Sequence, residues 1–133
     1  MTKEEKYDYW LQLAQYDLDT AQTMYTGDRW FYVVYMCQQA IEKLGKGLYN
    51  FHIGDEVPKI HNIRFILAKI EAELSVSIDP DIYRLADTLS AHYLGNRYPD
   101  FSKQPNMHVD KDSAKNLLEK TRGAFSWLLT LKK

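Results

Sequence analysis

The sequence predicts an all-α protein, an up-and-down bundle of about five helices without a sheet. Apolar residues recur at intervals of three and four along most of the chain, which is the period of an amphipathic helix. No segment shows the strict alternation that is typical of a half-buried strand. The 133 residues are 45% hydrophobic, which is enough for the core of a single domain spanning residues 1–133.

The first two predicted helices are the longest. The first covers residues 3–26, with an apolar stripe made of Tyr7, Trp10, Leu11, Ala14, Leu18, Ala21 and Tyr25. Gly27 should end this helix, and Asp28 should cap the next one. The second helix should cover residues 28–51, because Trp30, Val34, Cys37, Ile41, Leu44 and Leu48 follow the spacing of a bundle seam.

Three further helices are predicted after the break at Gly54 and Pro58. The third follows Pro58, with a buried face made of Ile60, Ile63, Leu67, Ile70 and Leu74. Asp79 and Pro80 should start the fourth, which reaches about Gly95, since Asp caps helices and Pro suits the first helical position. Residues 96–108 predict a loop, and ordered loops of this length are often functional. Asp110 then caps a last helix.

Charge and cysteine content exclude several classes of protein. The net charge of -1 excludes a global field that attracts DNA, so a phosphate contact must come from a local patch. The lone Cys37 excludes an intrachain disulfide, fits a reducing compartment, and is expected to be a buried side chain rather than a nucleophile. Because the chain starts with charged residues and lacks an apolar run of about 18 residues, we expect a cytoplasmic protein.

The middle of the second helix carries the first candidate site. One stripe contains Gln39, Lys43, Lys46 and Asn50, and the neighbouring stripe contains Gln38, Glu42 and Tyr49. Two lysines one turn apart favour a nearby anion. The alternative is a solvated face on which Glu42 and Lys46 form a helix-stabilising pair. Asp17 and Asp19 are interpreted as a surface pair.

His61 and Arg97 are further candidates. We place His61 in the first turn of the third helix, where the helix dipole disfavours a charged imidazole, so it would bond either a ligand or the backbone. Arg97 stands between two tyrosines and beside Pro99, a rigid setting for a guanidinium that binds phosphate or stacks on a base. The alternative is a structural contact between Arg97 and Asp100.

The sequence has no phosphate loop, Glu-x-x-His pair or zinc spacing, so we expect no metal or cofactor.

Four motifs together resemble the HEPN (higher eukaryotes and prokaryotes nucleotide-binding) family over nearly the whole chain. They are Ala14-x-x-Asp17-Leu18-x-x-Ala21, Gln38-Gln39-Ala40-Ile41-Glu42-Lys43-x-x-Lys46, Lys59-Ile60-His61-Asn62-Ile63 and Tyr93-x-x-x-Arg97-Tyr98-Pro99-Asp100. The resemblance implies four main helices plus a shorter one, a homodimer, and a nucleotide or RNA ligand. It also implies a minimal nucleotidyltransferase as protein partner, in a pair that behaves as toxin and antitoxin.

By the same resemblance, Lys43, Lys46, His61, Arg97 and Tyr98 would line a nucleotide or phosphate pocket. Tyr98 would also be a target for nucleotidylation by the partner. The ribonuclease branch of the family carries an Arg and, four to six residues later, a His. Here ten residues separate Arg97 from the next histidine, His108, so a non-enzymatic binding module is the first prediction. A degenerate metal-independent ribonuclease using Arg97 and His108 is one alternative, and a purely structural interaction module is the other.

Overall fold

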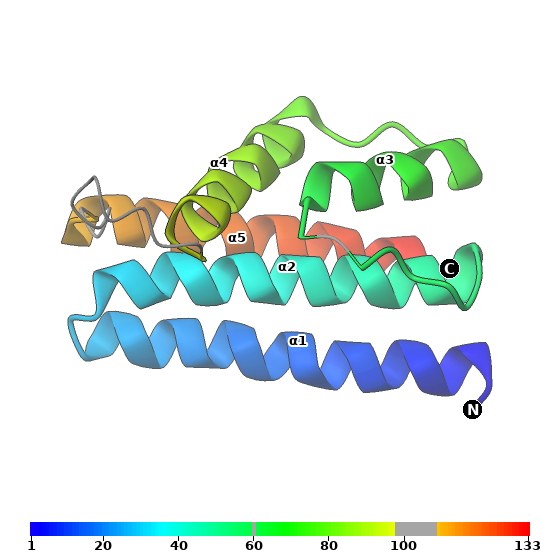
Figure 1. Cartoon of the computed structure of the whole chain (residues 1–133), viewed down its shortest axis with the longest axis horizontal. Helices are drawn as coiled ribbons and strands as arrows, with labels where there is room; N and C mark the ends of the chain where they lie inside the picture. Colours follow the sequence, from blue (N-terminus) through cyan, green and yellow to red (C-terminus); the bar gives the residue numbers. More distant parts are fainter. Residues whose placement is uncertain (60, 98–108) are drawn as a thin grey trace.

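Two long antiparallel helices, α1 and α2, run the length of the molecule, and the other helices pack against α2 (Figure 1). The computed structural model describes residues 1–59, 61–97 and 109–133, with only the backbone described for residues 94–97. The helices are α1 (Lys3–Thr26), α2 (Trp30–His52), α3 (Ile63–Leu74), α4 (Pro80–Arg97) and α5 (Lys111–Leu129), followed by a short 3-10 helix, η1 (Thr130–Lys132). The described ranges contain no strand, and the prediction of an all-α bundle is confirmed.

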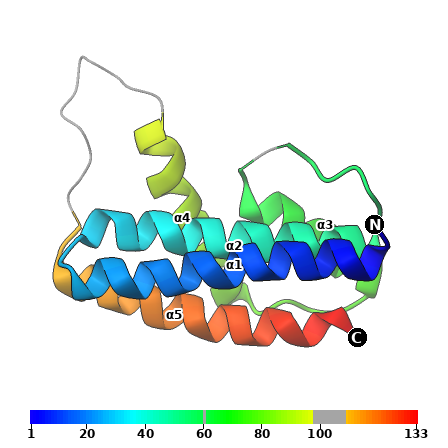
Figure 2. The same ribbon diagram turned by 90° about the horizontal axis from the view of Figure 1, so that it is seen from below.

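Helix α2 is the centre of the bundle. It contacts α1, α3, α4 and α5; α5 lies on the side away from α3, while α4 starts beside α5 and crosses to the other side of the bundle (Figure 2). Its buried residues occupy most of its circumference: Val33, Val34, Cys37, Gln38, Ala40, Ile41, Glu42, Leu44, Gly45, Gly47, Leu48 and Asn50. A helix that is covered on so many sides must be largely apolar, and its few buried polar groups must find partners within the protein.

The helix starts follow the capping residues of the sequence. Thr2 and Glu5 form a reciprocal capping box at the start of α1. Asp110 accepts a hydrogen bond of 2.8 Å from the backbone N–H of Ser113 at the start of α5, as predicted. At the start of α4, Asp79 accepts one of 2.8 Å from the N–H of Asp81.

Three predicted boundaries were wrong. Asp28 does not cap α2: it has a φ of 62° and forms the tight turn after Gly27, because Asp tolerates the left-handed conformation that this reversal needs. Helix α3 starts only at Ile63, where Asn62 caps it by accepting from the N–H of Phe65, so His61 lies before the helix and not in its first turn. Helix α4 continues past Gly95 to Arg97. The predicted buried position Ile60 lies outside the described residues.

Two glycines let neighbouring helices approach α2 closely. A Cβ atom on Gly47 would lie 2.9 Å from the Cβ of Trp10, and one on Gly45 would lie 3.1 Å from the Cγ2 of Ile66. At Gly47 an added Cβ would come closer than Cβ atoms normally approach other atoms, so α1 would have to shift, whereas at Gly45 the Ile66 side chain would have to move only slightly. Gly123 on α5 differs, because a Cβ there would meet no atom within 4 Å.

We expect Gly47→Ala to lower the free energy of unfolding by about 1–3 kcal/mol, because the added methyl group pushes α1 away from α2. Gly123→Ala is the matched control. It should raise stability by about 0.5–1 kcal/mol, since alanine has the higher helix propensity and the methyl group meets open space. Urea unfolding monitored by circular dichroism measures both. Equal effects of the two substitutions would contradict the close packing at Gly47.

Cys37 is fully buried in the seam of α2, and burial raises the pKa of its thiol from 9.0 to about 11. The expectation of a buried side chain is thus confirmed, and such a thiol is a poor nucleophile at neutral pH. No helix in the described part of the chain is long and apolar enough to cross a membrane.

The raised pKa of Cys37 predicts a loss of stability at alkaline pH. Below about pH 9 the thiol is neutral in both the folded and the unfolded state, so the buried side chain makes its full contribution to the free energy of unfolding. Between the unfolded pKa and about 11 only the unfolded state ionises, which favours unfolding by up to about 1.4 kcal/mol per pH unit. Cys37→Ala should therefore show a shallower loss of stability than the natural protein over this range. Parallel profiles in urea unfolding would contradict the assignment.

Candidate functional site

The candidate site centres on Glu42, a carboxylate held on the inward side of α2. Its side chain is only 4% exposed. Gln38 precedes it by one helical turn and Lys46 follows by one turn, so all three project from the same side of α2. Burying a carboxylate is unfavourable unless donors surround it.

Three side chains supply those donors. Lys46 Nζ lies 3.1 Å from Glu42 Oε2, and His61 Nδ1 lies 2.9 Å from Glu42 Oε1. Gln38 Nε2 donates to Glu42 Oε1 at 3.2 Å and also to the carbonyl oxygen of His61 at 3.2 Å. Because a carboxylate only accepts, Nδ1 of His61 is the donor in this contact. Glu42 therefore fixes the orientation of the His61 ring.

Lys43 belongs to a second ion pair. Its Nζ lies 2.6 Å from Oδ2 of Asp17 on α1, and the Asp17 side chain is only 9% exposed. The interpretation of Asp17 as a surface residue was wrong, since its carboxylate lies between α1 and α2. Although Lys43 and Lys46 are only one helical turn apart, Lys43 pairs with a carboxylate on α1 and Lys46 pairs with one on α2.

A polar groove opens beside Lys46, between α1, the end of α2 and the segment that leads to α3. Its volume is about 870 Å³, and it is lined by Lys6, Trp10, Lys46, Asn50, Asp55, Glu56, Val57, Pro58 and Lys59. The ammonium of Lys46 lies 5.9 Å from the centre of the Trp10 ring. Trp10 Nε1 donates to Asn50 Oδ1 at 2.8 Å, which fixes the indole at the groove.

The groove contains both paired and unpaired cations. Lys6 pairs with Asp55 at 2.8 Å, and this hydrogen bond lowers the pKa of the Asp55 carboxyl. Asn50 Nδ2 donates to the carbonyl oxygens of Gly54 and Asp55, so the segment after α2 is fixed to the helix. Lys59 is exposed and forms no ion pair with any other residue that the structure describes.

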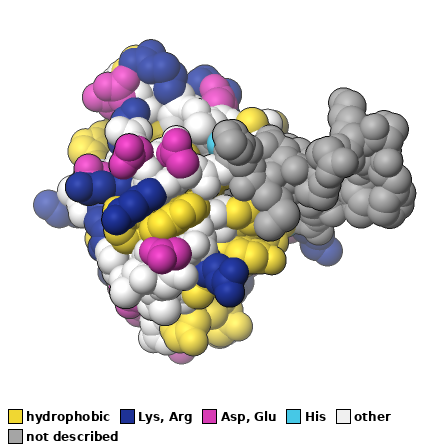
Figure 3. Space-filling view, turned by 90° about the vertical axis from the view of Figure 1, so that its left-hand side faces the viewer, with side chains coloured by type: hydrophobic (Ala, Val, Ile, Leu, Met, Phe, Trp, Pro, Cys, Tyr) yellow, Lys and Arg dark blue, Asp and Glu magenta, His cyan; other side chains and the backbone are white. Residues whose placement is uncertain are grey.

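Aromatic rings extend from His61 along the N-terminal half of α2. The His61 ring lies 5.0 Å from the Tyr93 ring of α4, and Tyr93 lies 5.0 Å from Tyr35. The Tyr32 ring, which is half exposed, continues the row and lies 6.1 Å from the Tyr35 ring. On the end of the bundle where α1 turns into α2, hydrophobic side chains alternate with charges of both signs (Figure 3).

The structure brings some of the predicted site residues together. Lys46 and His61 meet at Glu42, and Lys43 lies one turn before Lys46 but faces α1. The Glu42–Lys46 pair proposed in the alternative interpretation exists, yet it is buried and not on a solvated face. The side chains of Arg97, Tyr98 and His108, and the contact between Arg97 and Asp100, lie outside the described residues. No three His, Cys, Asp or Glu side chains in the described ranges form a cluster that could hold a metal.

Sequence reasoning missed the roles of Glu42, Asp17 and Trp10. The spacing of Gln38, Glu42 and Lys46 was visible, but burial of this stripe depends on which helices cover it. Trp10 was counted as a core residue, although its ring is only partly buried and borders the groove. The signal available in the sequence was one tryptophan at the polar edge of an apolar stripe.

Comparison with known proteins places the chain in a family. A model of the HEPN domain matches residues 7–131, and the chain belongs to the HEPN domain family. The fold is similar to that of TT1696 from Thermus thermophilus, with a TM-score of 0.81 at 23% identity over 95% of this chain and 98% of that one. It is also similar to ST0689, an archaeal HEPN homologue, with a TM-score of 0.75 at 23% identity over 96% and 98% of the two chains. No curated protein matches.

Replacing Glu42 tests whether the site is a buried network. Glu42→Ala leaves Lys46 and His61 without their shared partner and should lower the free energy of unfolding by about 3 kcal/mol. Glu42→Gln keeps the shape of the side chain and should lower the free energy of unfolding by a smaller amount. Glu119→Ala, on the exposed face of α5, is the control and should change stability by no more than about 0.5 kcal/mol. If Glu42→Ala is as mild as the control in urea unfolding, the network contributes no more than a surface pair.

Proposed function

We propose that this HEPN domain is a dimerising module that binds a nucleotide or another phosphate-bearing ligand and works inside the cell with a nucleotidyltransferase partner. The observation that carries the proposal is the groove of about 870 Å³, which is lined by Lys46, Lys59 and Trp10 and in which the ammonium of Lys46 lies 5.9 Å from the centre of the Trp10 ring. A volume of this size is within the range of small-molecule sites. Cations beside an aromatic ring suit a ligand that joins phosphate to a flat base.

The lysines of the groove retain binding capacity although carboxylates neutralise most of them. An ammonium has three N–H donors, and Lys46 and Lys6 each pair with one carboxylate. The remaining donors can reach ligand oxygens without breaking the pairs. Lys59 has no such pair within the described ranges, so it can turn toward a ligand at the lowest cost.

Lys43 and His61 would act at the margin of this groove. Glu42 occupies Nδ1 of His61, so the ring would contact a ligand through Nε2, which in the neutral ring accepts a hydrogen bond from a ligand hydroxyl. Lys43 is one turn from Lys46 on α2 but is paired with Asp17, so it would contribute through its remaining N–H donors and not through an unbalanced charge. Arg97 and Tyr98 enter the proposal by family resemblance alone, as do the homodimer and the toxin–antitoxin role.

The proposal predicts that one class of nucleotide raises the melting temperature. A ligand that binds only the native state stabilises it by about 2.7 kcal/mol when its concentration is 100 times Kd. We would measure thermal unfolding of the full chain with a panel of nucleotides and short RNAs at fixed protein concentration. Lys59→Gln and Trp10→Leu should each reduce the shift. Lys115→Gln on the exposed side of α5 is the matched charge control and should leave the shift unchanged.

Three outcomes would count against the proposal. A shift that survives both groove substitutions would mean that the groove is the wrong site. The absence of a shift with every ligand would favour the interaction module without a ligand. Cleavage of the RNA in the presence of EDTA, lost in Arg97→Ala and His108→Ala, would favour the ribonuclease alternative.

A further inference from the structure

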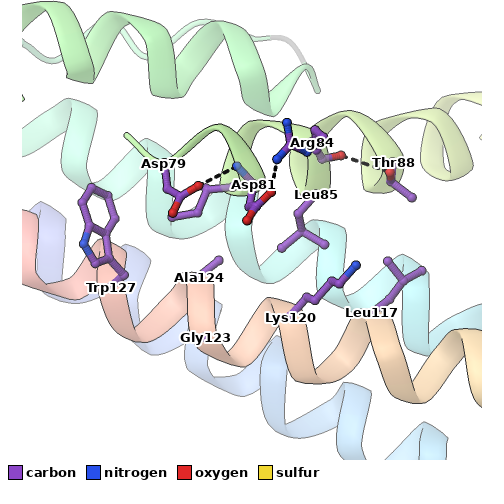
Figure 4. Close-up of a pocket in the computed structure, with 11 residues that line it drawn as sticks. Asp79, Asp81, Arg84, Leu85, Thr88, Leu117, Lys120, Gly123, Ala124 and Trp127 are labelled. Carbon is purple, nitrogen blue, oxygen red and sulfur yellow. Dashed lines mark hydrogen bonds and ion pairs between the residues drawn. The ribbon is translucent and has the colours of Figure 1, made fainter. Parts of the chain in front are cut away.

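A second groove lies between α4 and α5 and shares no residue with the Lys46 groove. Its volume is about 630 Å³. One wall is formed by Asp79, which precedes α4, and by Asp81, Ile82, Arg84, Leu85 and Thr88 from the first half of α4. The other wall is formed by Leu117, Lys120, Gly123, Ala124 and Trp127 from α5 (Figure 4). The match to the HEPN domain assigns no role to this groove, and the nucleotide site proposed above does not include it.

The described residues leave apolar surface exposed along the groove. Leu85 and Ala124 are buried, but Ile82, Leu117 and Trp127 are only partly buried although they pack against the core. Half-buried apolar side chains on both walls of one groove are typical of a binding surface, because contact with a partner would remove the rest of their area from water.

Gly123 supports the same interpretation. Glycine in the middle of a helix is less favourable than alanine by about 0.5–1 kcal/mol. At Gly45 and Gly47 close contacts within the chain account for the missing side chain, whereas a Cβ on Gly123 would meet nothing within 4 Å. The described residues do not fill the space above Gly123, which leaves this part of α5 open to a close approach from outside.

The dimensions of the groove match a helix. Its lining runs from Leu117 to Trp127 on α5, a rise of about 15 Å. Asp81, Leu85 and Thr88 on α4 follow a spacing of four and three residues, so each wall presents one helical face. A third helix of about ten residues could place its own ridge of side chains between these walls.

Charge gives the groove a direction. Lys120 extends from α5 toward Leu85 and has no partner among the described residues (Figure 4). At the other end, beside the start of α4, Arg84 pairs with the carboxylate of Asp81, and Asp79 accepts a hydrogen bond from the N–H of Asp81 (Figure 4). A partner would therefore place an acidic residue at Lys120.

We propose that the α4–α5 groove binds an amphipathic helix of about ten residues from another protein, with apolar side chains on the groove face and an acidic residue opposite Lys120. Small apolar contacts at Gly123 and Ala124 set the depth of the helix, and Lys120 sets its orientation. This binding does not depend on the nucleotide groove, so either proposal can fail alone.

The test uses the full chain and a fluorescein-labelled synthetic helical peptide, with leucines at i, i+3, i+4 and i+7 and a glutamate on the flank that faces Lys120. A second peptide has lysine in place of this glutamate, and a third has the same residues in scrambled order. Fluorescence anisotropy should show saturable binding of the glutamate peptide and none of the scrambled one. Binding to the scrambled peptide with equal affinity would overturn the proposal, as would no binding of the glutamate peptide.

Four variants locate the binding. Gly123→Leu fills the open space and should raise the Kd of the glutamate peptide at least about tenfold. Thr88→Phe should have the same effect from the opposite wall, and it replaces Gly123→Leu if that variant folds poorly. Lys120→Glu should reverse the preference toward the lysine peptide. Lys115→Glu, exposed on α5 outside the groove, is the matched control and should change neither affinity. Unchanged binding in both groove-filling variants would overturn the proposal.

Two other occupants give distinct results, and each would overturn the helix proposal. If light scattering shows a dimer that Gly123→Leu converts to a monomer, the groove is the interface between two copies of this chain. If anilinonaphthalene sulfonate binds in a way that Gly123→Leu removes while no peptide displaces it, the groove takes a small amphipathic anion.

Discussion

The burial of Glu42 on α2 is the constraint on which the other features of this molecule depend. Helix α2 is covered by α1, α3, α4 and α5, so its carboxylate must find its partners within the protein. Lys46 and Gln38 come from the same helix, while His61 comes from the segment before α3. The network therefore ties the segment between α2 and α3 to the centre of the bundle and gives the site its geometry.

Packing around α2 and the chemistry beside it follow from the same arrangement. Gly47 lets α1 approach, which brings Trp10 close enough to bond Asn50 and to border the groove near Lys46. Asp17 enters the same helix interface and neutralises Lys43. The lysines thus lie on a rigid helix with fixed counter-ions, a setting in which spare ammonium donors are held in place for an incoming anion.

The two grooves differ in the kind of contact they offer. The Lys46 groove combines cations, carboxylates and one indole, and two of its residues, Lys46 and Lys59, belong to the motifs that resemble the HEPN family. The α4–α5 groove is more apolar, and its one unpartnered lysine within the described part of the chain marks an orientation. A small domain can use both, because α2 and the first half of α4 expose separate surfaces.

The sequence by itself determined the all-α class, the extent of α1, the starts of α4 and α5, and the burial of Cys37, because helical periodicity and capping residues are local signals. It also singled out Lys43, Lys46 and His61. Only the tertiary structure decided that Glu42 and Asp17 are buried, that His61 precedes α3, and that Trp10 meets Lys46 at a groove. These facts depend on which helices cover each face of α2, and a repeat of three and four residues is the same for a covered face and an open one.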